Sequence, residues 1–136
     1  MKSSPRGSTA REIVKRYRAA SAIARAAGKL MLRHFRAGIR FTFKGPQDFL
    51  TTADREVERL VIQRLSKAFP GDRFIGEEGG GRAGRRTWVI DPIDGTANFA
   101  RGIPRFCISI AWLDGDEVAI GVIYDQIGRA SCRERV

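Results

Sequence analysis

Two carboxylates, Asp91 and Asp94, stand three residues apart where an apolar, strand-forming run ends. Pro92 lies between them and fixes the backbone φ angle, and Gly95 follows them and permits a tight turn. Thr96 can then cap a short helix whose first N–H groups would point into that turn. Hard carboxylate oxygens beside backbone N–H groups suit a magnesium ion that carries a phosphate. The alternative is that the two aspartates only cap a turn.

A second acidic pair, Glu77 and Glu78, follows another apolar run and is flanked by glycines. A phosphate monoester is anionic and resists attack by water. Metal ions screen its charge, lower the pKa of a bound water and align the attacking and leaving oxygens. Such a site needs several converging carboxylates, and this sequence supplies them from separate segments. We expect Glu78 to be exposed or to lie behind the site.

The string Asp91-Pro92-Ile93-Asp94-Gly95-Thr96 resembles the signature of the inositol monophosphatase family, which consists of magnesium-dependent, lithium-sensitive phosphatases. The resemblance runs from about residue 20 to residue 125, and includes Lys44–Asp54, the Gly-Glu-Glu element and Gly102-Ile103-Pro104. It implies Mg²⁺-dependent hydrolysis of a small phosphate monoester, similar to inositol 1-phosphate, by a metal-activated water. It also implies two or three magnesium ions in the intact site.

The resemblance assigns metal binding to four positions of this sequence. Glu77 matches the first metal carboxylate, and Asp91 matches the carboxylate that bridges two metals. Asp94 matches a ligand of the second metal. Ile93 matches a residue that contributes its backbone carbonyl oxygen.

The resemblance also implies phosphate-binding and catalytic positions. Gly95 and Thr96 match positions whose backbone N–H groups hold the phosphate, and Lys44 matches a basic residue near the phosphate. Thr96 and Asp54 match the pair that orients and deprotonates the attacking water, with help from Glu77. From the residues alone, an ordinary acid in the first turn of a helix is the favoured explanation of Asp54. Lys44 is equally an ordinary loop lysine.

The family takes a further metal carboxylate, in a Trp-Asp element, from its C-terminal half, which also selects the alcohol part of the substrate. This sequence contains neither that carboxylate nor the residues that select the alcohol, so we expect an N-terminal fragment that is inactive alone. The alternatives for the parent are a phosphatase of the same superfamily acting on histidinol phosphate, fructose 1,6-bisphosphate or a 3′-phosphonucleotide. For the intact parent, the resemblance implies a homodimer.

The chain has 136 residues and a formal net charge of +10. Its basic residues are scattered without interleaved aromatics, which indicates a solvated basic surface that attracts a small phosphorylated metabolite. A basic nucleic-acid-binding or regulatory module is the alternative from another class, although nucleic acid is not the partner we expect. No apolar run is long enough to cross a membrane, and two cysteines form no disulfide framework, so we expect a cytoplasmic protein.

Two helices are predicted. Residues 1–8 read as a flexible N-terminus, and Thr9 with Glu12 forms a capping box for a helix over 10–36. The second helix is expected over about 53–69, capped by Thr51 or Thr52. It should bury an apolar stripe and turn three charged side chains to other faces: Glu56, Glu58 and Arg64.

Short strands and loops complete the domain, which we assign to residues 9–126. A basic Gly-rich stretch over 79–86 is expected to be a flexible loop, and 97–101 a helical turn. Asp114-Gly115 is predicted to be the turn of a hairpin. The predicted strands cover 39–43, 73–76, 106–113 and 117–124.

The predicted fold class is α+β, a layered arrangement in which paired helices pack on a mainly antiparallel sheet. The resemblance identifies it as the N-terminal half of a sugar-phosphatase-type fold. Residues 127–136 show neither helical nor strand periodicity and resemble the translation of a sequencing-adapter end. We therefore expect them to be a non-native tail outside the fold, leaving the strand over 117–124 at an open sheet edge.

Overall fold

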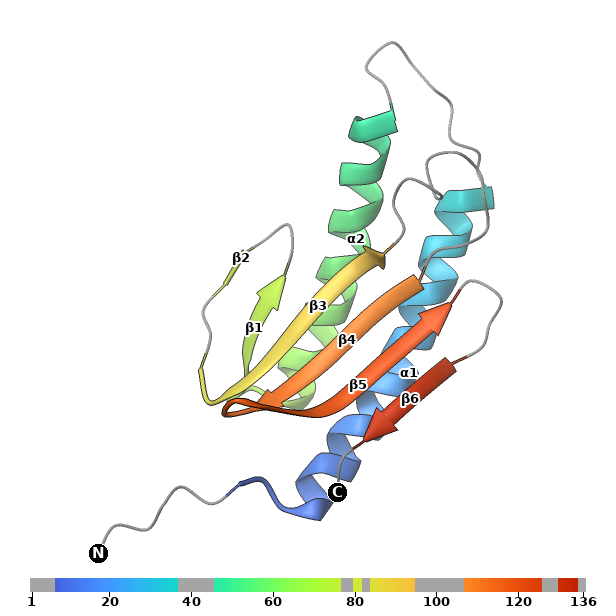
Figure 1. Ribbon diagram of the computed structural model, residues 1–136. Coiled ribbons are helices and arrows are strands. Elements are labelled where there is room, and N and C mark those ends of the chain that lie inside the picture. The colour runs from blue at the N-terminus through green and yellow to red at the C-terminus, as the bar shows by residue number, and fades with distance from the viewer. Residues whose placement is uncertain are drawn as a thin grey trace, which may run out of the picture.

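Two helices cover one face of a sheet, as Figure 1 shows. The computed structural model describes residues 7–36, 46–76, 80–81, 84–94, 107–125 and 130–134, with side chains for 7–36, 53–76, 84–91 and 107–125. Helices α1 (Ala10–Arg36) and α2 (Pro46–Ala68) run in opposite directions. Helix α2 contacts the third strand, while α1 contacts the fourth, fifth and sixth. The predicted α+β class is confirmed.

The described strands form a six-stranded sheet in the order β2-β1-β3-β4-β5-β6. Neighbours β1 and β3 are parallel, and every other neighbouring pair is antiparallel. Because β1 and β3 are parallel, the chain between them must return to the end of the sheet at which β1 begins. The strands are β1 (Arg73–Gly76), β2 (Gly80–Gly81), β3 (Arg86–Asp94), β4 (Cys107–Asp114), β5 (Glu117–Asp125) and β6 (Ala130–Glu134).

Helix α1 begins and ends where the sequence predicts. The backbone N–H of Thr9 donates to Glu12 Oε1 at 2.9 Å, and the N–H of Glu12 donates to Thr9 Oγ1 at 3.2 Å. This reciprocal capping box satisfies two N–H groups that have no partner inside the helix. The predicted apolar stripe faces the core; its buried members are Ile13, Ala20, Ile23, Ala24, Ala27 and Met31.

Helix α2 begins at Pro46, well before the predicted start. A proline suits the first turn of a helix because its missing N–H would have no partner there. Thr51 and Thr52 therefore lie inside the helix, and their predicted capping role is wrong. The expected buried stripe is present at Val57, Val61 and Leu65.

Glu58 was expected on an outward face of α2, and this prediction is wrong. Its exposed fraction is only 5%. Glu56 and Arg64 are exposed, as predicted. Glu56 Oε2 is in hydrogen-bonding contact with His34 Nε2, which links the outer surfaces of the two helices.

The predicted hairpin between β4 and β5 is confirmed, but its two turn residues are Gly115 and Asp116 rather than Asp114 and Gly115, because Asp114 still pairs with Glu117 in the sheet. Gly115 has a φ of 66°, in the left-handed region that glycine enters at little cost. The loop predicted over 79–86 is wrong in part, because β2 pairs with β1 and β3 already begins at Arg86.

The last strand contradicts the expectation for the C-terminal segment. Residues Ala130–Glu134 pair antiparallel with β5, from Tyr124↔Ala130 to Ile120↔Glu134. The segment therefore belongs to the sheet, and β6 rather than β5 forms the edge of the described sheet. An exposed strand edge offers unpaired N–H and C=O groups to any extended segment, whatever its periodicity. The strand predicted over 39–43 and the turn over 97–101 lie outside the described residues.

Candidate active site

The parallel pairing of β1 and β3 aligns the two acidic motifs. Gly76, the last residue of β1, is the register partner of Ile90 in β3. Glu77 follows Gly76 in the sequence, and Asp91 follows Ile90. The parallel register of β1 and β3 thus ends one residue before Asp91 on β3 and one residue before Glu77 in the sequence, which is the arrangement that a site shared by the two motifs requires.

The carboxylate of Asp91 has a chemistry that fits a metal ion. Its Oδ1 atom is buried and accepts no hydrogen bond from the residues that the structure describes. A carboxylate oxygen removed from water without a partner is costly, and native structures rarely keep one without a function. A hard divalent cation prefers such oxygen ligands. The chemistry of Asp91 therefore fits the predicted metal.

The pairing of β3 with β4 becomes irregular directly after Asp91. In the β3–β4 ladder, Asp91 pairs with Ser109 and Asp94 pairs with Cys107, so β3 contains one residue more than β4 over this step. Such a bulge bends the strand and re-aims its side chains, and bulges are frequent beside active sites. Pro92 fits here because it has no N–H to donate to a ladder. The irregularity therefore lies within the motif, between its two aspartates.

Helix α2 places two further carboxylates in the interior. Asp54 and Glu58 are one helical turn apart on the same face, with exposed fractions of 8% and 5%. Because α2 begins at Pro46, Asp54 lies more than two turns inside the helix. The first-turn explanation for Asp54 is therefore wrong, and a buried acid on the face toward the sheet needs another reason.

The remaining predicted site residues are described only in part. The backbones of Ile93 and Asp94 belong to β3, whereas Lys44, Glu77, Gly95 and Thr96 lie outside the described residues. Within the part that the structure describes, no group of three or more His, Cys, Asp and Glu side chains could hold a metal ion. The structure thus positions Asp54 and Asp91, and the complete ligand set stays a prediction.

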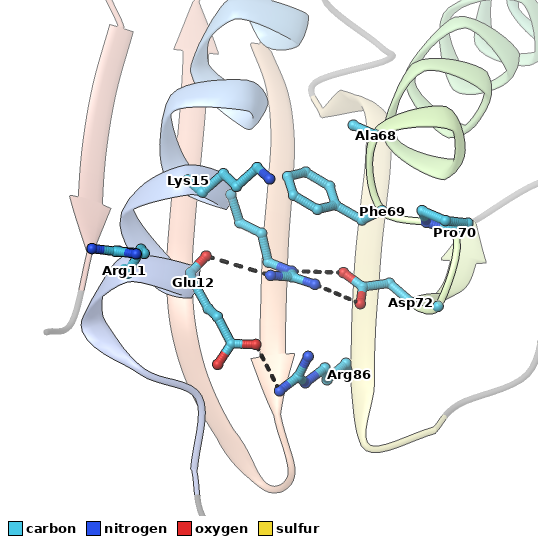
Figure 2. A pocket seen from close by; sticks show the side chains of 10 residues that line it. Arg11, Glu12, Lys15, Ala68, Phe69, Pro70, Asp72 and Arg86 are labelled. Atoms are coloured by element: carbon cyan, nitrogen blue, oxygen red, sulfur yellow. Dashed lines mark hydrogen bonds and ion pairs between the residues drawn. The ribbon is translucent and has the colours of Figure 1, made fainter.

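A cleft of about 440 Å³ lies at the opposite end of the sheet (Figure 2). It opens where α1 begins, α2 ends and β1 and β3 start, whereas Asp91 is near the end of β3. The lining residues are Arg11, Glu12, Lys15, Arg16, Ala68, Phe69, Pro70, Gly71, Asp72 and Arg86. This cleft is therefore separate from the candidate active site.

The wall of this cleft contains a buried polar cluster that the sequence analysis missed. Asp72 accepts hydrogen bonds from Arg16, Trp88 Nε1 and Trp112 Nε1, at 2.8–2.9, 2.9 and 3.1 Å. The Arg16 guanidinium also stacks on the rings of Phe69 and Trp112, at 4.4 and 4.7 Å from their centroids. Arg16 falls on the apolar stripe of α1, three residues after Ile13, and that spacing was the available signal.

Glu12 joins this cluster to the helix cap. Its carboxylate accepts a hydrogen bond from the Thr9 backbone N–H and forms an ion pair with Arg86 at 2.9 Å. The Thr9 backbone N–H, and then the Thr9 hydroxyl, Arg86 and Arg16, lower the pKa of Glu12 from its ordinary value, against an opposing effect of burial. The charges in this wall are thus largely paired with one another, as expected of a structural cluster.

The model of the inositol monophosphatase family matches residues 13–132, and the chain belongs to this family. Over 80 residues it is 44% identical to the fructose-1,6-bisphosphatase/inositol-1-monophosphatase of Thermotoga maritima, covering 59% of this chain and 31% of that relative. Over 107 residues it is 37% identical to the Nus factor SuhB of Xylella fastidiosa, covering 76% of this chain and 39% of that protein.

The fold agrees with solved structures of the family. An IMPase structure from Thermotoga maritima superimposes with a TM-score of 0.76 and 31% sequence identity, covering 89% of this chain and 48% of that one. The chain therefore spans less than half the length of these relatives. None of its described helices is long and apolar enough to cross a membrane.

Proposed function

We propose that this chain is the N-terminal part of a Mg²⁺-dependent phosphatase that hydrolyses a small phosphate monoester. Membership of a phosphatase family supports the reaction class. The observation that carries the proposal is the buried Asp91 Oδ1, which has no hydrogen-bond partner among the described residues. Asp91 directly follows Ile90, whose register partner Gly76 directly precedes Glu77 in the sequence, and this supports a site shared by the two acidic motifs.

In this proposal, the metal is held by the carboxylates of Glu77, Asp91 and Asp94 and by the carbonyl oxygen of Ile93. When bound, magnesium screens the phosphate charge and lowers the pKa of a water molecule. The role of Asp91 follows from its position at the start of the bulge, where the chain leaves the regular ladder.

The other proposed residues bind the phosphate and move the proton. Backbone N–H groups of Gly95 and Thr96 donate to phosphate oxygens, and Lys44 adds positive charge beside them. The Thr96 hydroxyl orients the attacking water, and Asp54, with Glu77, accepts its proton. Burial on the inner face of α2 suits this role for Asp54, because it keeps bulk water from the carboxylate.

For the substrate, we propose a small phosphorylated metabolite similar to inositol 1-phosphate. Fructose 1,6-bisphosphate is a second candidate, since a relative with 44% identity carries both activities in its name. Histidinol phosphate and 3′-phosphonucleotides complete the set. We further propose that residues 9–126 form the N-terminal domain and that residues 1–8 are a flexible segment before it. Residues 127–136 are non-native in origin in this proposal. The complete protein is proposed to be a cytoplasmic homodimer.

Phosphate release from these candidate substrates, with and without millimolar Mg²⁺, tests the proposal. The complete protein should turn over at least one monoester only when Mg²⁺ is present, and lithium should inhibit the reaction. The 136-residue chain should be inactive, because the proposed site lacks the carboxylate contributed by the C-terminal half of the family. Turnover that persists with a chelator, or no turnover of any monoester by the complete protein, would contradict the proposal.

A regulatory or nucleic-acid-binding role is the second candidate function. It is favoured by the net charge of +10 and by the relative named Nus factor SuhB. Binding of generic RNA to the complete protein can be followed while the salt concentration is raised. A steep loss of affinity with salt would indicate contacts to many phosphates and support this role. If RNA binds only weakly, and only at low salt, the nucleic-acid-binding role is excluded and phosphatase activity is the function that stands.

A further inference from the structure

The carboxylate of Glu58 lies directly against the end of strand β1. An ideal Cβ added to Gly76 would be 2.4 Å from Glu58 Oε1 and 2.5 Å from Glu58 Cδ, far closer than atoms in proteins approach. Gly76 is also buried. The side chain from α2 thus occupies the space that any other residue at position 76 would need. The contact therefore requires glycine at position 76 as long as position 58 carries a side chain of this length.

Packing alone does not explain an acid at position 58. The surrounding positions of the α2 inner face are apolar at Val57, Val61 and Leu65, and a hydrophobic side chain could fill the same space. Burying a carboxylate is costly unless it accepts hydrogen bonds, so its presence implies a polar task. Glu58 is 5% exposed and lies one helical turn after Asp54, on the same face.

Gly76 is the residue immediately before Glu77, the first carboxylate of the proposed metal site. We propose that Glu58 is a positioning residue, which fixes the backbone at Gly76 and thereby sets where Glu77 leaves β1 to bind metal. The inference rests on the proposed function. Side chains that hold a metal-binding segment in place typically change metal affinity by about 10-fold to 100-fold when they are replaced.

Mn²⁺ affinity, measured by electron paramagnetic resonance on the complete protein, tests the role of Glu58. The variant Glu58→Gln retains the volume of the side chain but replaces its carboxyl group with an amide. We expect it to weaken Mn²⁺ binding by about 10-fold or more, with a melting temperature in metal-free buffer within a few degrees of the wild type. Glu56→Gln is the matched control, because Glu56 lies on the exposed surface of the same helix. It should bind Mn²⁺ as the wild type does.

A second pair of variants tests the contact itself. Gly76→Ala should lower both the melting temperature and Mn²⁺ affinity, because the new methyl group displaces the Glu58 carboxylate. Adding Glu58→Ala removes the clash and should recover the melting temperature but not the Mn²⁺ affinity. Such non-additivity is the signature of two residues in direct contact.

The possible failures are distinguishable. If Asp91→Asn abolishes Mn²⁺ binding while Glu58→Gln leaves the affinity unchanged, the positioning role is wrong and the metal site stands. If the wild-type protein binds no Mn²⁺, the proposed function and this inference both fail. If Glu58→Gln weakens Mn²⁺ binding only in proportion to a large loss of metal-free stability, Glu58 is a structural residue and the proposal is overturned.

Discussion

Arg16 and Asp72 form a two-pronged ion pair that joins the first helix to the segment before β1. Arg16 Nε donates to Asp72 Oδ2 at 2.8 Å, and Arg16 Nη2 donates to Asp72 Oδ1 at 2.9 Å. The side chains are only 8% and 1% exposed. Two tryptophan N–H groups from β3 and β4 donate to the same carboxylate. One acid thus connects a helix with two strands at the end of the sheet opposite Asp91.

Arg16→Met should be strongly destabilising. The substitution retains much of the apolar stem but leaves the Asp72 carboxylate buried without its cation, which typically costs about 3–5 kcal/mol. Urea unfolding of the complete protein measures the change. Arg18→Met, on the exposed surface of α1, is the matched control and should change stability by less than about 0.5 kcal/mol. Equal effects of the two substitutions would show that the buried pair is not structurally important.

The capping box should give stability a defined pH dependence. The pKa of Glu12 is lowered in the folded protein, chiefly by the Thr9 backbone N–H. A lowered folded pKa means that the contribution is complete above the unfolded value of 4.5 and is lost as the pH falls through the folded pKa. The wild type should therefore be more stable than Glu12→Gln at pH 7, and this difference should shrink below pH 4.5. A difference independent of pH from 7 to 3 would contradict the assignment.

The hairpin turn should depend on glycine for conformational reasons alone. Gly115 has a φ of 66°, and a Cβ added there would meet no atom within 4 Å. Gly115→Ala should therefore cost about 1–2 kcal/mol from backbone strain without any clash. Gly71→Ala is a matched control, since a Cβ there also meets nothing within 4 Å and its φ is not positive. Comparable melting temperatures for both variants would refute the strain argument.

Elements defined by local signals could be predicted from the sequence. The Thr9–Glu12 capping box and the 3.6-residue apolar period located α1, and the Asp114-Gly115 turn signal between two alternating runs located β4 and β5. The position of Asp91 at the end of an apolar run also predicted its place near the end of a strand. In each case, the determining residues are neighbours in the chain.

Features that depend on distant partners could not be predicted in this way. Asp72 reads as part of a helix-ending turn until Arg16, Trp88 and Trp112 are seen around it. Glu58 reads as a solvated charge, and only its contact with Gly76 in another element shows otherwise. Strand β6 forms because the edge of β5 is available, which no pattern within residues 130–134 indicates.

The proposed water-orienting hydroxyl gives a separate prediction for Thr96→Ala. The substitution removes the hydroxyl but retains the backbone N–H, so phosphate binding through the backbone should persist. We expect turnover of the complete protein to fall by at least about 10²-fold, the usual contribution of a positioned proton-transfer group. The apparent Mg²⁺ affinity should change much less. A larger effect on Mg²⁺ affinity than on turnover would make Thr96 a metal-binding residue instead.

The central claim is that Asp91 holds the catalytic metal at the end of β3. The most direct measurement is Mg²⁺-dependent phosphate release by the complete protein carrying Asp91→Asn, beside Ser109→Ala, which alters the register partner of Asp91 on β4. Loss of a metal that neutralises developing charge should lower turnover by at least about 10³-fold for Asp91→Asn. Ser109→Ala should remain active, and both variants should melt near the wild-type temperature. Near-normal Mg²⁺-dependent turnover by Asp91→Asn would contradict the account.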